Sequence, residues 1–210
     1  LDGTGYGSDG AVWGGEVLIA DYADFERAAH FAYVPMPGSA AAIHEPWRMA
    51  VSYLFKHFGE DFHHLPIPFV EQLDRRTVKI LLRMIERGVN SPLTSSCGRL
   101  FDAVAALVGI RQQVTYEAQA AIELEMAIEE SGNDAAYTLD VLPEGSGWII
   151  ETRPLFEALV RDLRAGLPAS VISRRFHNGL VAVFERVACL LRDRTTLNRV
   201  CLSGGTFQNV

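Results

Sequence analysis

Features that define several common functional classes are missing from this sequence. Its 210 residues include three cysteines, Cys97, Cys189 and Cys201, which are far apart and odd in number. They form no CxxC pair, which argues against a zinc knuckle or a disulfide framework. We therefore expect each cysteine to be a small buried hydrophobic residue. No apolar run approaches the roughly 20 residues that span a bilayer, so no membrane partner is expected.

An excess of basic charge is also absent. The chain has 19 Lys and Arg against 26 Asp and Glu, and its formal net charge is -7. Without a basic stripe, we expect no nucleic-acid partner, although backbone amides can still bind a single nucleotide. The chain opens with neither the basic nor the apolar segment of a signal peptide, so a cytoplasmic location is the expected default.

Familiar catalytic motifs are not found either. The six histidines form no HxxxH or HExxH pair, so the chain itself holds no complete histidine metal site. The phosphate-binding motif GxxxxGK followed by Ser or Thr is missing, which excludes a P-loop kinase. No GxSxG motif or spacing singles out a Ser–His–Asp triad.

The order of expected elements begins with strands and continues with helices. Residues 1–38 have the composition of short strands joined by turns, and residues 43–130 are mostly helical in pattern. A β-hairpin is expected over 137–151 and a long helix over about 168–192. A short buried strand is then expected at Val200–Leu202, before a glycine turn.

Three helices within the middle of the chain have clear boundaries. Residues 74–87 form a helical pattern that Gly88 would end, and residues 99–108 form another that stops at Gly109. A further helix is expected over 117–131, with apolar side chains on one face.

This order predicts an α/β fold in which mixed sheets are flanked by helices. A helix, a buried strand and a glycine turn in succession are typical of an α/β nucleotide site. The whole pattern resembles a truncated actin-like ATPase (ASKHA) fold. Residues 1–136 would be its first lobe, with a helical insertion, and residues 137–210 the start of the second. The chain lacks an initiator Met, and we expect it to be a fragment of a longer protein.

The first candidate site is the glycine-rich segment 2–7. A strand that ends in Asp-Gly-x-Gly places a carboxylate beside bare backbone amides. Gly3 and Gly5 would let a phosphate approach closely, Thr4 would add a hydroxyl, and Asp2 is suited to bind a metal. A glycine-rich hairpin in which Asp2 caps its own turn is equally consistent with this segment.

The second candidate site is the segment 200–209. A strand, the turn Ser203-Gly204-Gly205 and a new helix would form an anion-binding site at the helix N-terminus. Asn209 would point back toward a ribose or a base. An ordinary strand-to-helix turn is the alternative. The nucleotide interpretation is favoured because an actin-like cleft needs two such glycine segments.

Two further groups of polar residues lie in the helical region. Asp102 sits one turn inside a helix, near Ser95, Ser96 and Arg99, and could orient ribose hydroxyls. An i, i+3 ion pair between Asp102 and Arg99 is the better interpretation from spacing alone. Glu123, on the next helix, would by itself be a solvated charge.

Together these segments resemble the HypF family of carbamoyltransferases, which act in nickel–iron hydrogenase maturation. The resemblance covers essentially the whole chain in the same order, and its motifs are specific as a set. They are residues 2–7, Trp13-Gly14-Gly15-Glu16, Glu45-Pro46-Trp47-Arg48, residues 94–104, residues 115–117 and residues 202–209.

The resemblance implies both a fold and an activity. In this domain HypF proteins are similar to the tRNA threonylcarbamoyl-transferase family, which has the actin-like ATPase fold. The domain would accept carbamoyl-adenylate, which another domain makes from carbamoyl phosphate and ATP. It would pass the carbamoyl group to the C-terminal cysteine thiol of a HypE-type partner. The thiocarboxamide formed there would be the precursor of the cyanide ligands of the hydrogenase iron. Because that thiol is the nucleophile, no catalytic residue is expected in this chain.

The resemblance also implies roles for individual residues. Asp2 would bind a divalent metal (zinc, iron or magnesium), with histidine ligands before it and an aspartate after Asn209, all outside this chain. Ala118 stands where the family commonly has glycine. Residues expected to face the nucleotide (ATP or AMP) are Gly3, Thr4, Gly5, Ser95, Ser96, Arg99, Asp102, Glu123, Gly204, Gly205 and Asn209, with Arg48 as a further cleft residue.

Other functions fit the same glycine segments. They are a nucleotide-binding actin-like module without turnover, a small-molecule O-carbamoyltransferase and a sugar kinase of the same fold. All of them require the two glycine segments to face one ligand. Placement of Gly5 and Gly205 on unconnected surfaces would refute the prediction.

Overall fold

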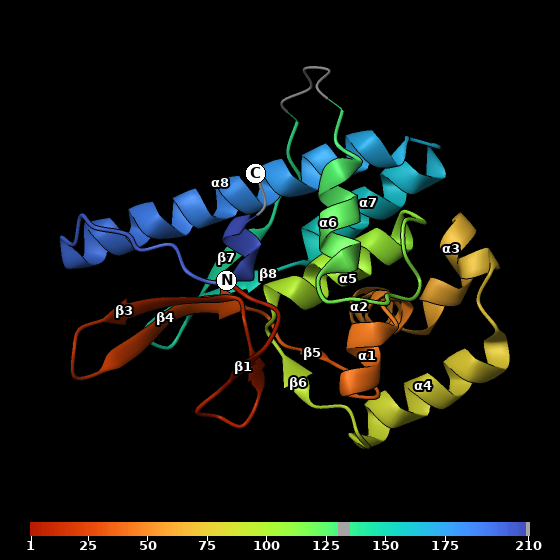
Figure 1. Ribbon diagram of the computed structural model, residues 1–210, viewed down its shortest axis with the longest axis horizontal. Helices are drawn as coiled ribbons and strands as arrows, with labels where there is room; N and C mark the ends of the chain where they lie inside the picture. The colour runs from red at the N-terminus through yellow and green to blue at the C-terminus, as the bar shows by residue number, and fades with distance from the viewer. Residues whose placement is uncertain (130–134, 209–210) are drawn as a thin grey trace.

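The computed structural model describes residues 1–129 and 135–208, which form two four-stranded mixed sheets flanked by helices (Figure 1). This confirms the predicted fold class. In the first sheet β2 and β6 are parallel, and the other neighbours are antiparallel. Its strands, in spatial order, are β1 (Gly5–Tyr6), β2 (Val12–Trp13), β6 (Leu93–Thr94) and β5 (Val34–Pro35).

The second sheet joins strands from two distant parts of the sequence. Its order is β3 (Glu16–Ala20), β4 (Phe25–Phe31), β8 (Gly147–Glu151) and β7 (Asp140–Glu144). Strands β4 and β8 are parallel, whereas β3–β4 and β7–β8 are antiparallel pairs. The hairpin expected over 137–151 is therefore confirmed. Because this sheet takes strands from both sides of residue 136, the division into lobes stays a prediction.

Local signals set the boundaries of α4 (Arg75–Arg87). The Asp74 side chain accepts a hydrogen bond from the Thr77 amide, and Gly88 ends the helix in the left-handed conformation. The helix predicted over 74–87 is confirmed. The neighbouring helices, which lie on the same side of Figure 1, are α1 (Ala40–His44), α2 (Trp47–Phe58), the 3₁₀ helix η1 (Gly59–His64) and α3 (Pro68–Glu71).

Helix α5 (Cys97–Leu107) lies at the centre of the helical region. All of its residues except Gly98 are buried, and it packs against α2 and α6 (Gln119–Met126). The helix predicted over 99–108 is confirmed with a start two residues earlier. Of the helix predicted over 117–131, α6 forms Gln119–Met126, and residues 130 and 131 lie outside the described residues.

The long helix α8 (Ala169–Thr195) connects the sheet to the helical region. It follows α7 (Arg153–Arg164) and runs along one edge of the molecule (Figure 1). Phe184 packs edge-on against Phe31 of β4, and Phe176 packs edge-on against Phe101 of α5. Within the described ranges, no helix is long and apolar enough to cross a membrane.

Two predictions about the end of the chain are wrong. Val200–Leu202 is not a strand, and Val200 and Leu202 are 71% and 68% exposed. A single extended segment gains no ladder hydrogen bonds without a neighbouring strand, and the described residues pair none with it. Cys201 is exposed rather than buried, Cys189 is half-buried, and Cys97 is buried as expected.

Candidate functional site

The two glycine-rich segments meet at the two ends of the chain. The Leu1 nitrogen donates to the Ser203 carbonyl at 2.5 Å, and the Thr206 amide donates to the Leu1 carbonyl at 3.3 Å. The Gly205 amide, at the start of η2 (Gly205–Gln208), lies 3.4 Å from Oδ1 of Asp2. Figure 1 shows η2 beside the N-terminus. Segments 200 residues apart in the sequence therefore lie side by side.

The Asp2 backbone is held on its other side by Gly14, which follows β2, and by α5. The Asp2 amide donates to the Gly14 carbonyl at 2.7 Å, and that carbonyl also accepts from the Cys97 amide at 3.2 Å. The Gly98 amide donates in turn to the Asp2 carbonyl at 3.2 Å. One carbonyl, that of Gly14, thus connects the start of the chain to the first turn of α5.

Ser96 forms hydrogen bonds with both α5 and the opening segment. Its hydroxyl accepts a hydrogen bond from the Arg99 amide at 3.2 Å, which makes Ser96 the N-cap of α5. The same hydroxyl lies 2.7 Å from the Gly3 carbonyl and can donate to it. The predicted residues Gly3, Ser96 and Arg99 are therefore close together.

Close backbone packing explains two of the glycines. A Cβ atom on Gly98 would lie 2.7 Å from the Gly3 Cα, and one on Gly204 would overlap the Leu1 carbonyl oxygen. Gly204 also has a φ of 101°, which favours glycine. By contrast, a Cβ on Gly3 would be 3.9 Å from its nearest neighbour, the Arg99 guanidinium. Chain packing alone thus accounts for Gly98 and Gly204, and the surroundings of Gly3 are more open.

Arg99 and Asp102 form a buried ion pair on α5. Nε of Arg99 lies 2.6 Å from Oδ2 of Asp102, and the two side chains are 7% and 5% exposed. Burial raises the pKa of Asp102 to about 6, although the charge and hydrogen bond of Arg99 lower it in part. The i, i+3 interpretation is confirmed. A ribose contact by Asp102 stays a prediction, and it would require neighbouring atoms to move.

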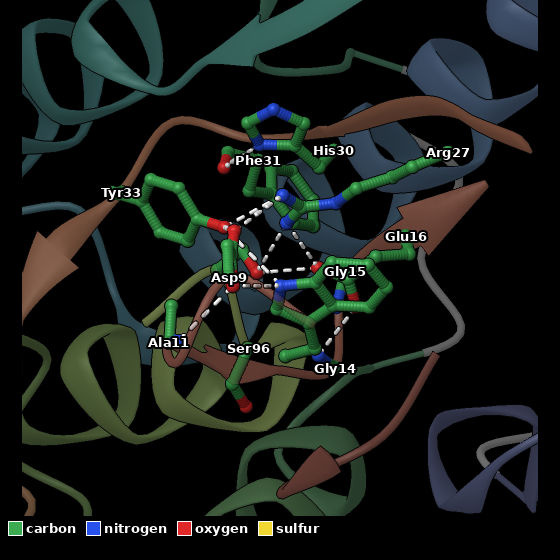
Figure 2. Close-up of polar contacts among 12 residues, drawn as sticks. Asp9, Ala11, Gly14, Gly15, Glu16, Arg27, His30, Phe31, Tyr33 and Ser96 are labelled. Carbon is green, nitrogen blue, oxygen red and sulfur yellow. Dashed lines mark hydrogen bonds and ion pairs between the residues drawn. The ribbon is translucent and has the colours of Figure 1, made fainter. Parts of the chain in front are cut away.

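A second polar cluster surrounds the Trp-Gly-Gly-Glu motif (Figure 2). Oε2 of Glu16 accepts from the Gly14 amide at 2.5 Å and from the Gly15 amide at 2.8 Å. Oε1 of Glu16 lies 2.8 Å from Nη2 of Arg27 and accepts from the Ser95 hydroxyl. Sequence reasoning missed Glu16 and Arg27 as site residues, although a glutamate directly after two glycines is a signal for such contacts.

The other side of Arg27 is enclosed by aromatic and acidic groups. Its guanidinium lies 4.0 Å over the Trp13 ring and donates to the Tyr33 hydroxyl at 2.6 Å. Asp9 accepts from Trp13 Nε1 at 2.9 Å and from the Tyr33 hydroxyl. Burial acts to raise the pKa of Asp9, but these hydrogen bonds, one from the Ala11 amide and the Arg27 charge outweigh it and lower the pKa.

Other predicted residues of the terminal segments are placed differently. Gly5 lies in β1 and pairs with Trp13 in β2, where a Cβ would come 3.3 Å from the Trp13 carbonyl oxygen. Thr4 is exposed beside it. Asn209 lies outside the described residues, so its predicted contact with a ribose or base stays a prediction.

Glu123 and Arg48 are held by local partners. Glu123 accepts from Nε of Arg111 at 2.5 Å, and this hydrogen bond lowers the pKa of the carboxyl. Arg48 donates to Glu45 at the start of α2. Ala118, which precedes α6, has a φ of 59° and is left-handed, the conformation that glycine favours. Nucleotide contacts by Glu123 and Arg48 stay predictions.

The described residues do not form a metal site by themselves. In residues 1–129 and 135–208, no group of three or more His, Cys, Asp or Glu could hold a metal ion. Asp2 is a single exposed carboxylate whose Oδ1 accepts from the Gly3 amide at 2.8 Å. One carboxylate is too few ligands for a specific metal site. Asp2 as a metal ligand stays a prediction that depends on residues outside this chain.

Comparison with known families defines the class of this fold. The model of a family described as "Carbamoyltransferase, Kae1-like Domain, second subdomain" matches residues 1–210. The chain is 34% identical to the Carbamoyltransferase HypF of Synechocystis sp., over 99% of this chain and 28% of that protein. It is 36% identical to that of Rhodobacter capsulatus, over 100% of this chain and 26% of the relative. The chain belongs to the HypF carbamoyltransferase family, as its motifs predicted.

Solved structures agree with this assignment. A full-length HypF in the phosphate- and nucleotide-bound form is 42% identical, with a TM-score of 0.92 over 100% of this chain and 32% of that one. The HypF of T. kodakarensis is 31% identical, with a TM-score of 0.85 over 100% of this chain and 28% of that one. The chain thus spans about a quarter to a third of the length of these relatives.

Proposed function

We propose that this chain forms part of the adenylate-binding site of a HypF-type carbamoyltransferase. The complete enzyme would make carbamoyl-adenylate from carbamoyl phosphate and ATP. It would transfer the carbamoyl group to the C-terminal cysteine thiol of a HypE-type partner, in the cytoplasm, during hydrogenase maturation. Family membership and a nucleotide-bound relative support this proposal. The contacts of the Asp2–Gly3 turn with Gly205, at the start of η2, and with Gly98, in the first turn of α5, are the observation that carries it.

The arrangement of amides around Asp2 suits an anion. The Gly3 and Gly205 amides both donate to the same carboxylate oxygen, at 2.8 Å and 3.4 Å. Two amides that converge on one anionic oxygen could also hold an oxygen of the adenylate phosphate once the Asp2 side chain turns away. The Arg99 guanidinium, whose Nε pairs with Asp102, has its Nη2 close to Gly3 on the same side.

The transfer requires positioning more than activation. The partner thiolate attacks the carbamoyl carbon, the carbon–oxygen bond to the phosphate breaks, and AMP leaves with the electron pair. The adenylate is already an activated carbonyl compound, so this chain would bind and orient it and stabilise the phosphate charge. A divalent metal would add Lewis-acid polarisation, with Asp2 as one ligand and the rest from outside this chain.

Replacement of Asp2 tests the proposal. In the full-length protein, Asp2→Ala should lower transfer to the partner thiol by about a hundredfold or more, because it removes the carboxylate that would hold the divalent metal. The mass gain of the partner measures transfer. Asp24→Ala is a matched control, because Asp24 is also exposed and also accepts from the next amide, at 2.7 Å.

Two outcomes would contradict the proposal. Wild-type transfer by Asp2→Ala would remove Asp2 from the site. Tight binding of adenine nucleotide by the wild-type protein, without transfer to any thiol, would indicate a nucleotide-binding module without turnover.

A further inference from the structure

The Gly14 carbonyl links two parts of the proposed adenylate site. It accepts from the Asp2 amide at 2.7 Å and from the Cys97 amide at 3.2 Å. The first contact fixes the start of the Asp2–Gly3 turn, and the second fixes the first residue of α5. A small rotation of the Gly14–Gly15 peptide would therefore move both.

Glu16 determines the orientation of that peptide. The amides of Gly14 and Gly15 are buried and both donate to Oε2 of Glu16, at 2.5 Å and 2.8 Å. A buried amide without an acceptor costs free energy. The Gly14 and Gly15 amides therefore keep the turn where the Glu16 carboxylate can accept from both. Figure 2 shows Glu16 beside Gly14 and Gly15.

Arg27 holds the carboxylate in turn. Its Nη2 lies 2.8 Å from Oε1 of Glu16 and 3.1 Å from the Ser95 hydroxyl, which itself donates to Glu16. The stacked Trp13 ring limits motion of the guanidinium. The Arg27 and Glu16 side chains are 15% and 8% exposed, so water offers little replacement for these contacts.

We infer that Glu16, held by Arg27, is a positioning residue for carbamoyl transfer. It acts through Gly14, which places the Asp2–Gly3 turn and the N-terminus of α5, and it is not required to touch the adenylate. The inference rests on the function proposed above, because it assumes that this turn faces the substrate.

Replacement by glutamine should separate positioning from folding. Both oxygens of Glu16 accept hydrogen bonds, two from backbone amides and two from Arg27 and Ser95. Glutamine has the same shape but only one acceptor oxygen. Its NH₂ group must therefore face hydrogen-bond donors, either the two backbone amides or Arg27 and Ser95. The turn has to shift to relieve this mismatch.

The test uses the full-length protein with rates expressed per folded molecule. Glu16→Gln should lower kcat for transfer about tenfold or more and leave KM for the partner within about twofold, because a small displacement at a reacting site mainly affects rate. Hydrogen exchange should accelerate in peptides that contain residues 1–15 and 95–100. Exchange in α4 should keep its wild-type rate.

Matched variants complete the design. Glu26→Gln is the control, because Glu26 lies on the neighbouring strand β4 and pairs with Arg194 at 2.9 Å on an exposed surface. It should leave kcat and exchange unchanged. Arg27→Lys keeps the charge beside Glu16 without the guanidinium fork and should give an intermediate kcat. If Glu16→Gln does not fold, Arg27→Lys replaces it in the test, and kcat and hydrogen exchange are measured in the same way.

The failure of this inference differs from the failure of the proposed function. A wild-type kcat in folded Glu16→Gln, together with a slow Asp2→Ala, overturns the positioning role alone. Faster exchange that extends to α4 overturns it as well, because Glu16 would then act on general stability. A wild-type rate in Asp2→Ala overturns the proposed function and removes the basis of the positioning role.

Discussion

The molecule contains two buried arginine–carboxylate pairs that resemble each other in geometry and differ in surroundings. The Arg27–Glu16 pair spans 2.8 Å and the Arg99–Asp102 pair 2.6 Å. Glu16 also accepts from two backbone amides and from Ser95. Asp102 lies inside α5, where burial raises its pKa to about 6.

The comparison shows what a buried carboxylate needs in order to organise a site. Desolvation opposes the charged form of Asp102, and the charge and hydrogen bond of Arg99 favour it. Glu16 has hydrogen-bond donors from several chain segments, so its charge fixes backbone positions. Asp102 depends mainly on Arg99, so its ionisation is sensitive to pH. The following variants test this contrast, from the largest expected effect to the smallest.

Removal of Arg27 should have the largest effect. Arg27→Met leaves Glu16 buried without its charged partner and should lower the free energy of unfolding by about 3–5 kcal/mol. Hydrogen exchange of the β3 and β4 amides in the full-length protein measures this loss. Arg153→Met, which removes the exposed pair with Glu157, should cost no more than about 1 kcal/mol. Equal losses for the two variants would show that burial does not distinguish these pairs.

Asp102 should give a pH dependence of opposite sense to that of an ordinary paired carboxylate. Its pKa rises from 3.8 to about 6 on folding, so the folded state binds the proton more tightly. The contribution of Asp102 to stability, about 3 kcal/mol, should therefore be present in full below about pH 4 and be lost as pH rises through about 6. Asp102→Asn should lack this contribution. Unfolding of both proteins between pH 4 and 7 checks it, and parallel curves would contradict it.

The smallest effect on stability is expected at α6 and at Ala118, which precedes it. This helix packs beside α5, and the substitutions proposed here leave both ion pairs intact. Ala118 adopts a φ of 59°, so Ala118→Gly should relieve strain and raise the free energy of unfolding by about 0.5–1 kcal/mol. Ala121→Gly, inside the same helix, should instead lower it by about 1 kcal/mol. The two changes make the same substitution with opposite expected signs. Thermal unfolding compares them, and a shared sign would contradict the assigned strain.

Elements with local signals were predictable from the sequence. The start of α4 at Asp74 and its end at Gly88 follow from hydrogen bonds within a few residues. The hairpin of β7 and β8 has a turn between two apolar segments, which is also a local pattern. The strand predicted at Val200–Leu202 was wrong because a strand depends on a partner that its own composition does not supply.

The candidate site was only partly predictable for the same reason. The Asp-Gly and Ser-Gly-Gly segments were recognisable by composition, and the contact between Asp2 and Gly205 is present. Arg27 and Glu16 are 11 residues apart, and no motif links them. They meet because β3 and β4 form an antiparallel pair, with Leu18 opposite Arg27. Adenylate binding by the terminal segments stays a prediction.

The sequence by itself determined the family, the mixed α/β class and the ends of helices such as α4, because these depend on residue identity and on neighbours along the chain. The tertiary structure alone decided that the Gly14 carbonyl joins Asp2 to α5 and that Glu16 holds the amides behind it. These contacts form only after the strands and α5 have packed together. Packing brings the buried amides within hydrogen-bond distance of acceptors that are far away in the sequence or on another element.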